Sequence, residues 1–207
     1  VNERRAIVRP VFLFLKSKGE NVRLEQDKLC YNDQIFTADQ VKEIPSDLRS
    51  MCTKVTKTHV FFSGEFSPLS NFYECLLDDG RRMYTGSEQM YQWGKFTFHE
   101  DHDGAEKLME CTSNRQAWQM SRSVKESDRW INSMGEACMK RCLKLKYEQI
   151  EEFRNLILAH KDKTFVEATR NRKWGIGLPI TSNDIYDPSK WRGDNLCGKI
   201  IQSLIPT

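Results

Sequence analysis

The sequence lacks the features of several large protein classes. Its longest uninterrupted apolar run is five residues, at positions 11–15, whereas a membrane-spanning helix needs ~20. We therefore expect no membrane-spanning helix and no membrane partner. The chain also has no G-x-S-x-G elbow, no Walker loop and no H-E-x-x-H motif. Local support is thus missing for an α/β-hydrolase, a P-loop NTPase or a zincin protease.

Cysteines are present but lack the spacing of a metal or disulfide framework. The seven cysteines are odd in number and widely spaced, and no two form a C-x-x-C pair. This pattern is typical of reduced thiols, so we expect an intracellular protein, cytoplasmic or nuclear, with no metal. Cys138 and Cys142 would share a helix face, and we expect both to be small buried hydrophobes.

A strong excess of charge is also missing. Residues 1–58 contain 11 basic and 8 acidic side chains, and residues 59–207 contain 21 of each, so the net charge of +3 comes from the N-terminal part. Proteins that bind long duplex nucleic acid usually carry a strongly basic face. The balance argues against avid nonspecific DNA binding, but it is compatible with a single modified nucleotide as ligand. The basic N-terminal part could steer a nucleic-acid substrate or could be a packed extension.

The pattern of apolar and turn-forming residues changes after residue 58 and divides the chain into two parts. In residues 1–58, short apolar stretches separated by turn residues predict small strands at 11–15, 22–24 and 30–36, a short helix from residue 37 and a turn at 45–47. We interpret this part as an N-terminal extension or small subdomain. Residues 59–207 have the size of one domain.

The second part is predicted to be mostly helical. Strands are expected at 60–62 and 164–168, and a hairpin joins 72–77 to 83–84 around Asp78-Asp79-Gly80. Apolar spacing predicts helices at 85–96, 104–111, 114–120, 128–145, 150–157 and 196–204. The fold class is therefore α+β, predominantly helical, with one main domain.

One group of polar residues follows a single helix face. Glu88, Tyr91, Gln92 and Lys95 recur at helical spacing, and the step from Glu88 to Lys95 returns within about 20°. An acid and an amine on one stripe could act as general base and phosphate ligand. Alternatively, Glu88 closes a capping box with Thr85, and Lys95 is a solvated surface residue.

A second group combines tryptophans with glycines. Trp174 precedes Gly175 and Gly177, and Trp191 precedes Gly193 and Asn195. Glycines let a flat ligand approach backbone and ring together. The alternative is that these tryptophans belong to the core and the glycines serve turns.

Four segments occur in order across residues 60–205, with Arg122, Trp130 and Lys146 at fitting positions between them: 66–73 (FSPLSNFY), 84–96 (YTGSEQMYQWGKF), 174–177 (WGIG) and 191–199 (WRGDNLCGK). Together they resemble the NADAR family, also called YbiA-like. Residues 1–58 lie outside the resemblance.

The resemblance implies an N-glycosidase that cuts the bond between a ribose and a base-like nitrogen. Some members hydrolyse ribosylaminopyrimidine phosphates of early riboflavin synthesis, and others remove ADP-ribose from guanine in nucleic acid. The family's glutamate falls on Glu88 and its lysine on Lys95, which are the expected catalytic residues. Expected substrate-binding residues are Ser70, Asn71, Phe72, Tyr91, Arg122, Trp130, Trp174, Gly175, Trp191 and Asn195.

The sequence departs from the family pattern at one point. Members often have an acidic residue shortly before the pocket tryptophan, whereas the stretch from Glu167 to Trp174 is one residue short and offers Asn171 and Arg172. Arg172 could meet phosphate there instead.

The chemistry implied by the resemblance uses side chains alone, with no metal and no cofactor. A carboxylate near C1′ stabilises an oxocarbenium-like centre, and Glu88 would do this. Lys95 would hold a hydroxyl or phosphate or form a Schiff base. Trp174 and Trp130 would stack on the base, and the backbone amides of Ser70 and Asn71 would meet phosphate.

We expect a hydrolase of ADP-ribosylated guanine in DNA or RNA, or of a related ADP-ribosyl nucleotide. The alternatives are a hydrolase of riboflavin intermediates and a non-catalytic module that binds ADP-ribose or NAD.

Overall fold

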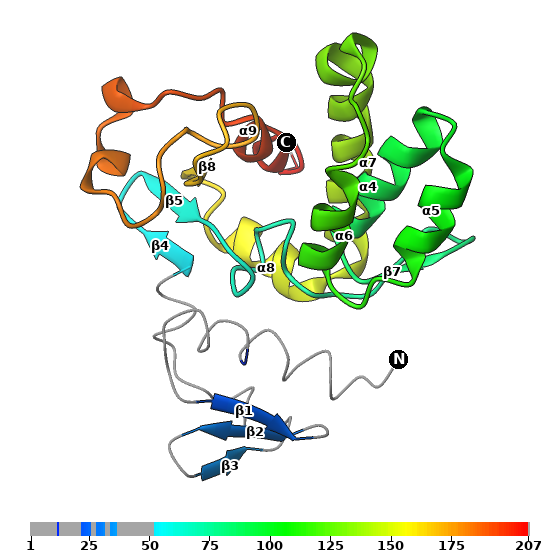
Figure 1. Ribbon diagram of the computed structural model, residues 1–207. Helices are drawn as coiled ribbons and strands as arrows, with labels where there is room; N and C mark the ends of the chain where they lie inside the picture. Colours follow the sequence, from blue (N-terminus) through cyan, green and yellow to red (C-terminus); the bar gives the residue numbers. More distant parts are fainter. Residues whose placement is uncertain (1–11, 13–21, 26–27, 32–33, 37–51, 207) are drawn as a thin grey trace. The chain divides into compact units, whose positions relative to one another are not determined.

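The computed structural model describes residues 12, 22–25, 28–31, 34–36 and 52–206 (Figure 1). The chain divides into two compact units, Val1–Arg49 and Ser50–Thr207, so the second unit begins at Ser50, whereas the sequence predicts its start at residue 59. Of the strand expected at 11–15, only residue 12 is described, and it is helical instead of extended. The helix expected from residue 37 and the turn at 45–47 lie outside the described residues.

The N-terminal unit contains a three-stranded antiparallel meander. Its strands are β1 (Val22–Glu25), β2 (Lys28–Tyr31) and β3 (Gln34–Phe36), with β2 in the centre. Leu29 of the central strand is fully buried, whereas Ile35 of the edge strand is 60% exposed. Strands are therefore present in both of the described stretches where apolar patterning predicted them.

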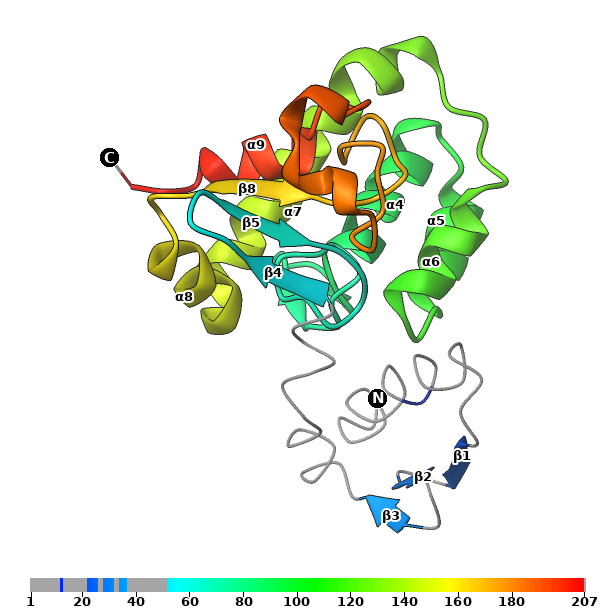
Figure 2. The same ribbon diagram turned by 90° about the vertical axis from the view of Figure 1, so that its left-hand side faces the viewer.

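The second unit is built on a small mixed sheet. Strand β5 (His59–Phe62) pairs antiparallel with β4 (Thr53–Val55) and parallel with β8 (Thr164–Glu167). The register places Phe62 opposite Glu167 at the carboxyl ends of the two parallel strands. Because parallel pairing requires a crossover, the long segment between β5 and β8 holds most of the helices (Figure 2).

Both faces of this sheet are covered. Phe61 and Val166 pack on one face against the irregular C-terminal segment that contains Ile176, whereas Phe62 and Phe165 belong to the main helical core. Apolar residues on both faces are the pattern of a fully buried strand. This explains why β5 reads as a continuous apolar run in the sequence.

Six α-helices are described: α4 (Ser87–Phe98), α5 (His102–Met109), α6 (Asn114–Ser121), α7 (Gly135–Gln149), α8 (Glu151–Ala159) and α9 (Leu196–Gln202). A π-helical turn, Trp130–Met134, precedes α7. Strands β6 (Leu77–Asp78) and β7 (Met83–Tyr84) form a hairpin at the predicted place, but residues 72–76 of the expected first strand are not in a strand. The fold class is α+β and predominantly helical, as predicted. In the part of the chain that the structure describes, no helix is long and apolar enough to cross a membrane.

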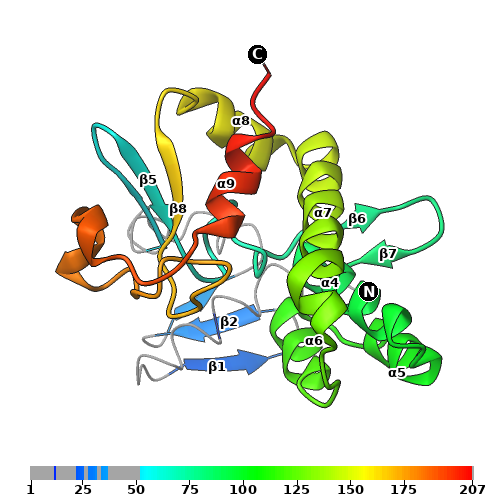
Figure 3. The ribbon, with the colours of Figure 1, turned by 90° about the horizontal axis from the view of Figure 1, so that it is seen from above.

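Helix α4 is packed by α5, α6 and α7, and Figure 3 shows it alongside α7. Gly94 permits this approach, since a Cβ there would lie 2.6 Å from the Sγ atom of Cys138. Cys142 is fully buried and Cys138 is partly buried beside α4. Cys142 is thus the small buried hydrophobe expected, whereas Cys138 is only partly buried.

The start of α4 corrects one interpretation. Thr85 and Glu88 do not form a capping box: the backbone N–H of Thr85 donates to Oε1 of Gln89 at 2.7 Å, and Glu88 instead accepts from Gln92. Gln89 also donates to the carbonyls of Leu108 and Cys111. Gln89 therefore makes side-chain hydrogen bonds at the start of α4, and the Glu88 carboxylate is available for another role.

Candidate active site

A cavity of about 610 Å³ opens beside α4. Its walls come from α4, the turn that carries Asn71 and Phe72, the end of α6 and the segment that follows β8. The volume lies within the range of small-molecule sites. Segments distant in sequence therefore meet at one hollow.

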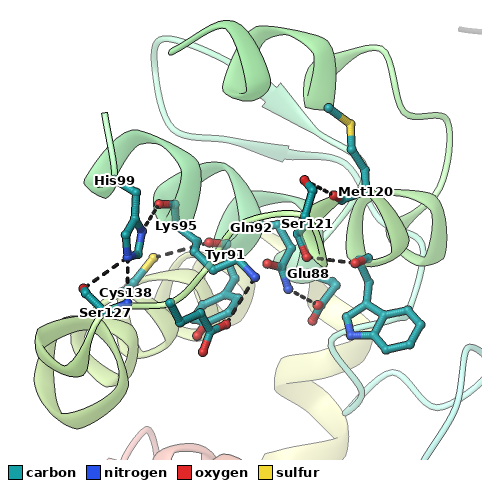
Figure 4. Close-up of polar contacts among 12 residues, drawn as sticks. Glu88, Tyr91, Gln92, Lys95, His99, Met120, Ser121, Ser127 and Cys138 are labelled. Atoms are coloured by element: carbon teal, nitrogen blue, oxygen red, sulfur yellow. Dashed lines mark hydrogen bonds and ion pairs between the residues drawn. The ribbon is translucent and has the colours of Figure 1, made fainter. Parts of the chain in front are cut away.

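The stripe predicted on α4 lines this cavity. Glu88, Tyr91, Gln92 and Lys95 are each at most 6% exposed. Gln92 donates through Nε2 to Oε1 of Glu88 at 2.6 Å, and Figure 4 shows both side chains on the same helix face as Tyr91 and Lys95. The alternative of a solvated Lys95 is thereby corrected.

Lys95 is ion-paired at the opposite end of the stripe. Its Nζ lies 3.2 Å from Oε1 of Glu126, a cavity residue whose side chain is 38% exposed. The Lys95 charge also acts on Glu88 and opposes part of the effect of burial on that carboxyl. Lys95 thus lies between the buried acid and the outer part of the cavity.

Burial makes Glu88 an unusual carboxyl. Loss of solvation raises its pKa from 4.5 to about 7, and the Gln92 hydrogen bond and the Lys95 charge only partly offset this rise. A carboxyl with a pKa near neutrality can exchange a proton at physiological pH, as general acid–base catalysis requires.

A second buried carboxyl, Glu167, lies in the same cavity. It is the last residue of β8 and is 7% exposed. Burial is the main cause that raises its pKa to about 7. A hydrogen bond with Cys197 opposes this rise, and the charge of Glu88 adds to it. When one of these two carboxyls is ionised, the other therefore keeps its proton more strongly.

The backbone around Glu167 is tightly held. Its N–H donates to Oδ1 of Asn195 at 2.9 Å, and its carbonyl accepts from the N–H of Ile176 at 3.0 Å. Asn195 also donates to the carbonyl of Phe165. Asn195 therefore fixes the strand end that presents the acid.

Buried polar atoms without partners gather in this cavity. Within the described residues, Oε1 of Gln92, Oε2 of Glu167 and Oγ1 of Thr169 have no hydrogen-bond partner, and all three residues line the cavity. Such atoms are costly unless a ligand or water satisfies them. They indicate a polar ligand close to the two acids. We call Glu88, Gln92, Glu167 and Thr169 the inner site.

The outer part of the cavity is aromatic and cationic. The Arg122 guanidinium lies 5.5 Å from the Trp118 ring, and Lys173 Nζ lies 5.0 Å from the Trp174 ring. Phe72 contacts Trp118 edge-on, with ring centroids 6.3 Å apart. Such pairs suit flat rings and phosphates. We call these five residues the cavity rim.

The predicted site residues fall into two sets. The structure brings Asn71, Phe72, Glu88, Tyr91, Lys95, Arg122 and Trp174 together around the cavity. The others, Ser70, Trp130, Gly175, Trp191 and Asn195, are not among its lining residues.

Each residue of the second set has a local packing or hydrogen-bonding role. Trp130 lies behind Tyr91, with ring centroids 5.4 Å apart, and Trp191 donates to the carbonyl of Ile185 at 2.9 Å. A Cβ at Gly175 would lie 2.6 Å from the Glu167 carbonyl. Ser70 accepts from Lys146 through its carbonyl.

Sequence reasoning missed Glu167, Trp118 and Lys173 as site residues. In the sequence, Glu167 stands out only as the start of a shortened segment, whereas the structure places it directly in the cavity. The signal available in the sequence was an acidic side chain near the end of the strand expected at 164–168, because ligands often bind at the carboxyl ends of strands. Arg172 is exposed and is not among the lining residues.

Comparisons with known proteins agree with this architecture. The chain is 28% identical over 148 residues to N-glycosidase R617 of Acanthamoeba polyphaga mimivirus, which covers 70% of this chain and 85% of the viral protein. It is 26% identical over 168 residues to protein irg-1 of Caenorhabditis elegans, which covers 72% and 79% of the two chains.

A solved structure is similar as well. The NMR structure of the E. coli protein YbiA matches with a TM-score of 0.58 at 26% identity, covering 75% of this chain and 88% of YbiA. The model of the NADAR domain matches residues 60–204, which include the whole cavity. The chain therefore belongs to the NADAR domain family.

Proposed function

We propose that this protein is an N-glycosidase that hydrolyses the bond between a ribose and a base nitrogen. The observation that carries the proposal is the pair of buried carboxyls, Glu88 and Glu167, in one cavity. The name of the mimivirus relative, an N-glycosidase, supports the same reaction type.

The electrostatics suggest a role for each acid. Gln92 and the Lys95 charge favour the ionised form of Glu88. For Glu167, burial and the charge of Glu88 favour the protonated form against an opposing hydrogen bond with Cys197. Two carboxyls in opposite protonation states are what glycoside hydrolysis uses.

The reaction would proceed by cleavage of the C1′–N bond. Glu167 gives its proton to the leaving nitrogen, while the Glu88 carboxylate stabilises positive charge at C1′. A water molecule then adds to C1′ and loses its proton to Glu88. Proton exchange with solvent restores the starting state, so the cycle requires no net acid or base.

The remaining residues bind and orient the substrate. The ion pair with Glu126 supports Lys95 as a charged donor to a ribose hydroxyl or phosphate, in preference to a nucleophilic amine. At the cavity rim, Arg122 and Lys173 suit phosphate, and Trp118 and Trp174 suit flat rings.

We propose ADP-ribosylated guanine in nucleic acid, or a related ADP-ribosyl nucleotide, as the substrate class. Two aromatic–cationic pairs at the rim favour a ligand with two rings and a diphosphate. A ribosylaminopyrimidine phosphate offers one ring and one phosphate and would engage only part of the rim.

The test measures release of ADP-ribose from an oligonucleotide that carries ADP-ribosyl guanine, with hydrolysis of ribosylaminopyrimidine phosphate measured in parallel. We expect release of ADP-ribose by the wild-type protein, loss of release by E88Q, and normal release by E136Q, whose parent residue is on α7 in an ion pair with Lys140. Release from the small phosphate alone would replace the proposed substrate. Tight ADP-ribose binding without either reaction would indicate a non-catalytic module.

A further inference from the structure

Lys146 is a fully buried lysine that the proposed reaction does not use. It lies on α7 with no exposed surface. A lysine is almost never fully buried unless its charge is compensated. Its surroundings therefore indicate what the charge does.

The Lys146 ammonium contacts one carbonyl and two rings. Nζ donates to the Ser70 carbonyl at 2.7 Å and lies 5.4 Å from the Tyr73 ring and 4.8 Å from the Phe153 ring. A charge-assisted hydrogen bond is roughly twice as strong as a neutral one. The turn at Ser70 is thus held from inside the core.

This turn leads directly to the inner site. The residue after Ser70 is Asn71, whose carbonyl accepts from the Glu88 N–H at 3.2 Å and whose Oδ1 accepts from the Ser87 hydroxyl at 3.1 Å. Ser70 Oγ also accepts from the Phe72 N–H at 3.1 Å. The Ser70 carbonyl that Lys146 binds therefore belongs to the turn whose next residues contact the first turn of α4, through Asn71, and form part of the cavity rim, through Phe72.

We propose that Lys146 is a positioning residue of the active site, whose ammonium fixes the Ser70 turn and thereby sets Asn71 and Phe72 against Glu88. The inference rests on the proposed function for its activity readout. It concerns a residue that lies outside the cavity and touches no substrate.

The charge of Lys146 is lost within an accessible pH range. Burial lowers its pKa from 10.5 to about 8, and the facing groups Cys75, Cys197 and Glu152 partly oppose this. These come from the segment before β6, from α9 and from α8. Deprotonation replaces the charge-assisted bond with a weaker neutral one, so the Ser70 turn loosens as the pH rises through this value.

The first experiment compares K146M with K144M in the full chain. Lys144 is exposed on the same helix, so its variant controls for loss of a positive charge. We expect kcat/KM to fall up to ~100-fold in K146M, as small misplacements of catalytic groups do, and to stay unchanged in K144M. Wild-type activity in a folded K146M would overturn the proposal.

The pH profile separates positioning from simple structural support. In the wild-type protein, log(kcat/KM) should fall with a slope near −1 just above neutrality, where Glu167 loses its proton, and near −2 above pH 8, where Lys146 also does. K146M should keep the slope of −1. An unchanged second step in K146M would assign that step to another group.

A measurement on the wild-type protein covers the case in which K146M does not fold. NMR would follow the Lys146 Cε carbon and the amides of Phe72 and Tyr73 between pH 6 and 10. We expect the three signals to titrate together. Amides that ignore the lysine titration would overturn the proposal. Absence of any glycosidase activity would reject the proposed function and leave this coupling measurable.

Discussion

The inner site and the cavity rim solve different problems with charged residues. Glu88 and Glu167 are 6% and 7% exposed and carry raised pKa values, whereas Trp118 is 37% exposed and Arg122 is open to solvent beside it. Burial is costly for a carboxylate and tunes its proton affinity. Exposure leaves cations and aromatic rings accessible to a ligand. On the proposed function, this difference assigns the chemistry to the inner site and substrate recognition to the cavity rim.

Glu167→Gln and Glu88→Gln should have the largest effects on activity, and Glu167→Gln tests the assignment of the general acid. If Glu167 is the general acid, the E167Q substitution lowers kcat by ~10²–10⁴-fold. The fall in kcat is much smaller for a substrate whose leaving base departs without being protonated. Steady-state kinetics on two substrates that differ in leaving base measures this. Equal losses on both would contradict the assignment of general acid, and E136Q supplies the control.

Glu88→Gln should raise stability while it abolishes turnover. The folded-state pKa of Glu88 lies above its unfolded value of 4.5, at about 7, so the folded state binds the proton more tightly. Wild-type stability is then fully present below pH 4.5 and declines as pH rises through 7. The difference in unfolding free energy between E88Q and wild type, measured with urea, should therefore increase by on the order of 2 kcal/mol from pH 5 to pH 7.5. A difference in unfolding free energy that does not change with pH would contradict a Glu88 carboxyl whose ionisation is opposed by burial.

Trp118→Ala tests the rim and should act on binding. A stacked base contributes ~1–3 kcal/mol, so we expect KM to rise about tenfold while kcat at saturation is kept. The matched control is R82A, because the Arg82 guanidinium lies 4.7 Å from the Trp93 ring, a cation–ring pair whose residues are not among those lining the cavity. A loss of kcat with unchanged KM would place Trp118 in the chemistry instead.

The two regions also differ in how far the sequence predicts them. Helical periodicity alone placed Glu88 and Lys95 on one face, because both belong to one continuous helix. Glu167 reaches the same cavity through parallel pairing of β8 with β5, about a hundred residues earlier in the chain. Local sequence does not encode such a distant strand partner. The short segment before Trp174 instead favours Arg172, which is exposed and does not line the cavity.

Motif residues were harder to assign because structural and chemical roles share residue types. Asn195 adopts a left-handed conformation, with φ 53°, and holds the backbone of β8 with both ends of its amide. Its influence on Glu167 runs through the backbone. A motif identifies such residues as significant but does not separate a ligand contact from a support.

Trp191→Phe should have the smallest effect and tests that distinction directly. Trp191 packs beside the sheet face that contains Phe61, and its indole N–H donates to the Ile185 carbonyl at 2.9 Å. Phenylalanine keeps an aromatic ring but loses the donor, which should cost about 1 kcal/mol of unfolding free energy. We expect unchanged kcat and KM, measured alongside urea unfolding. A raised KM with unaltered stability would move Trp191 from the support of the fold to the binding of substrate, because only a ligand contact would be lost.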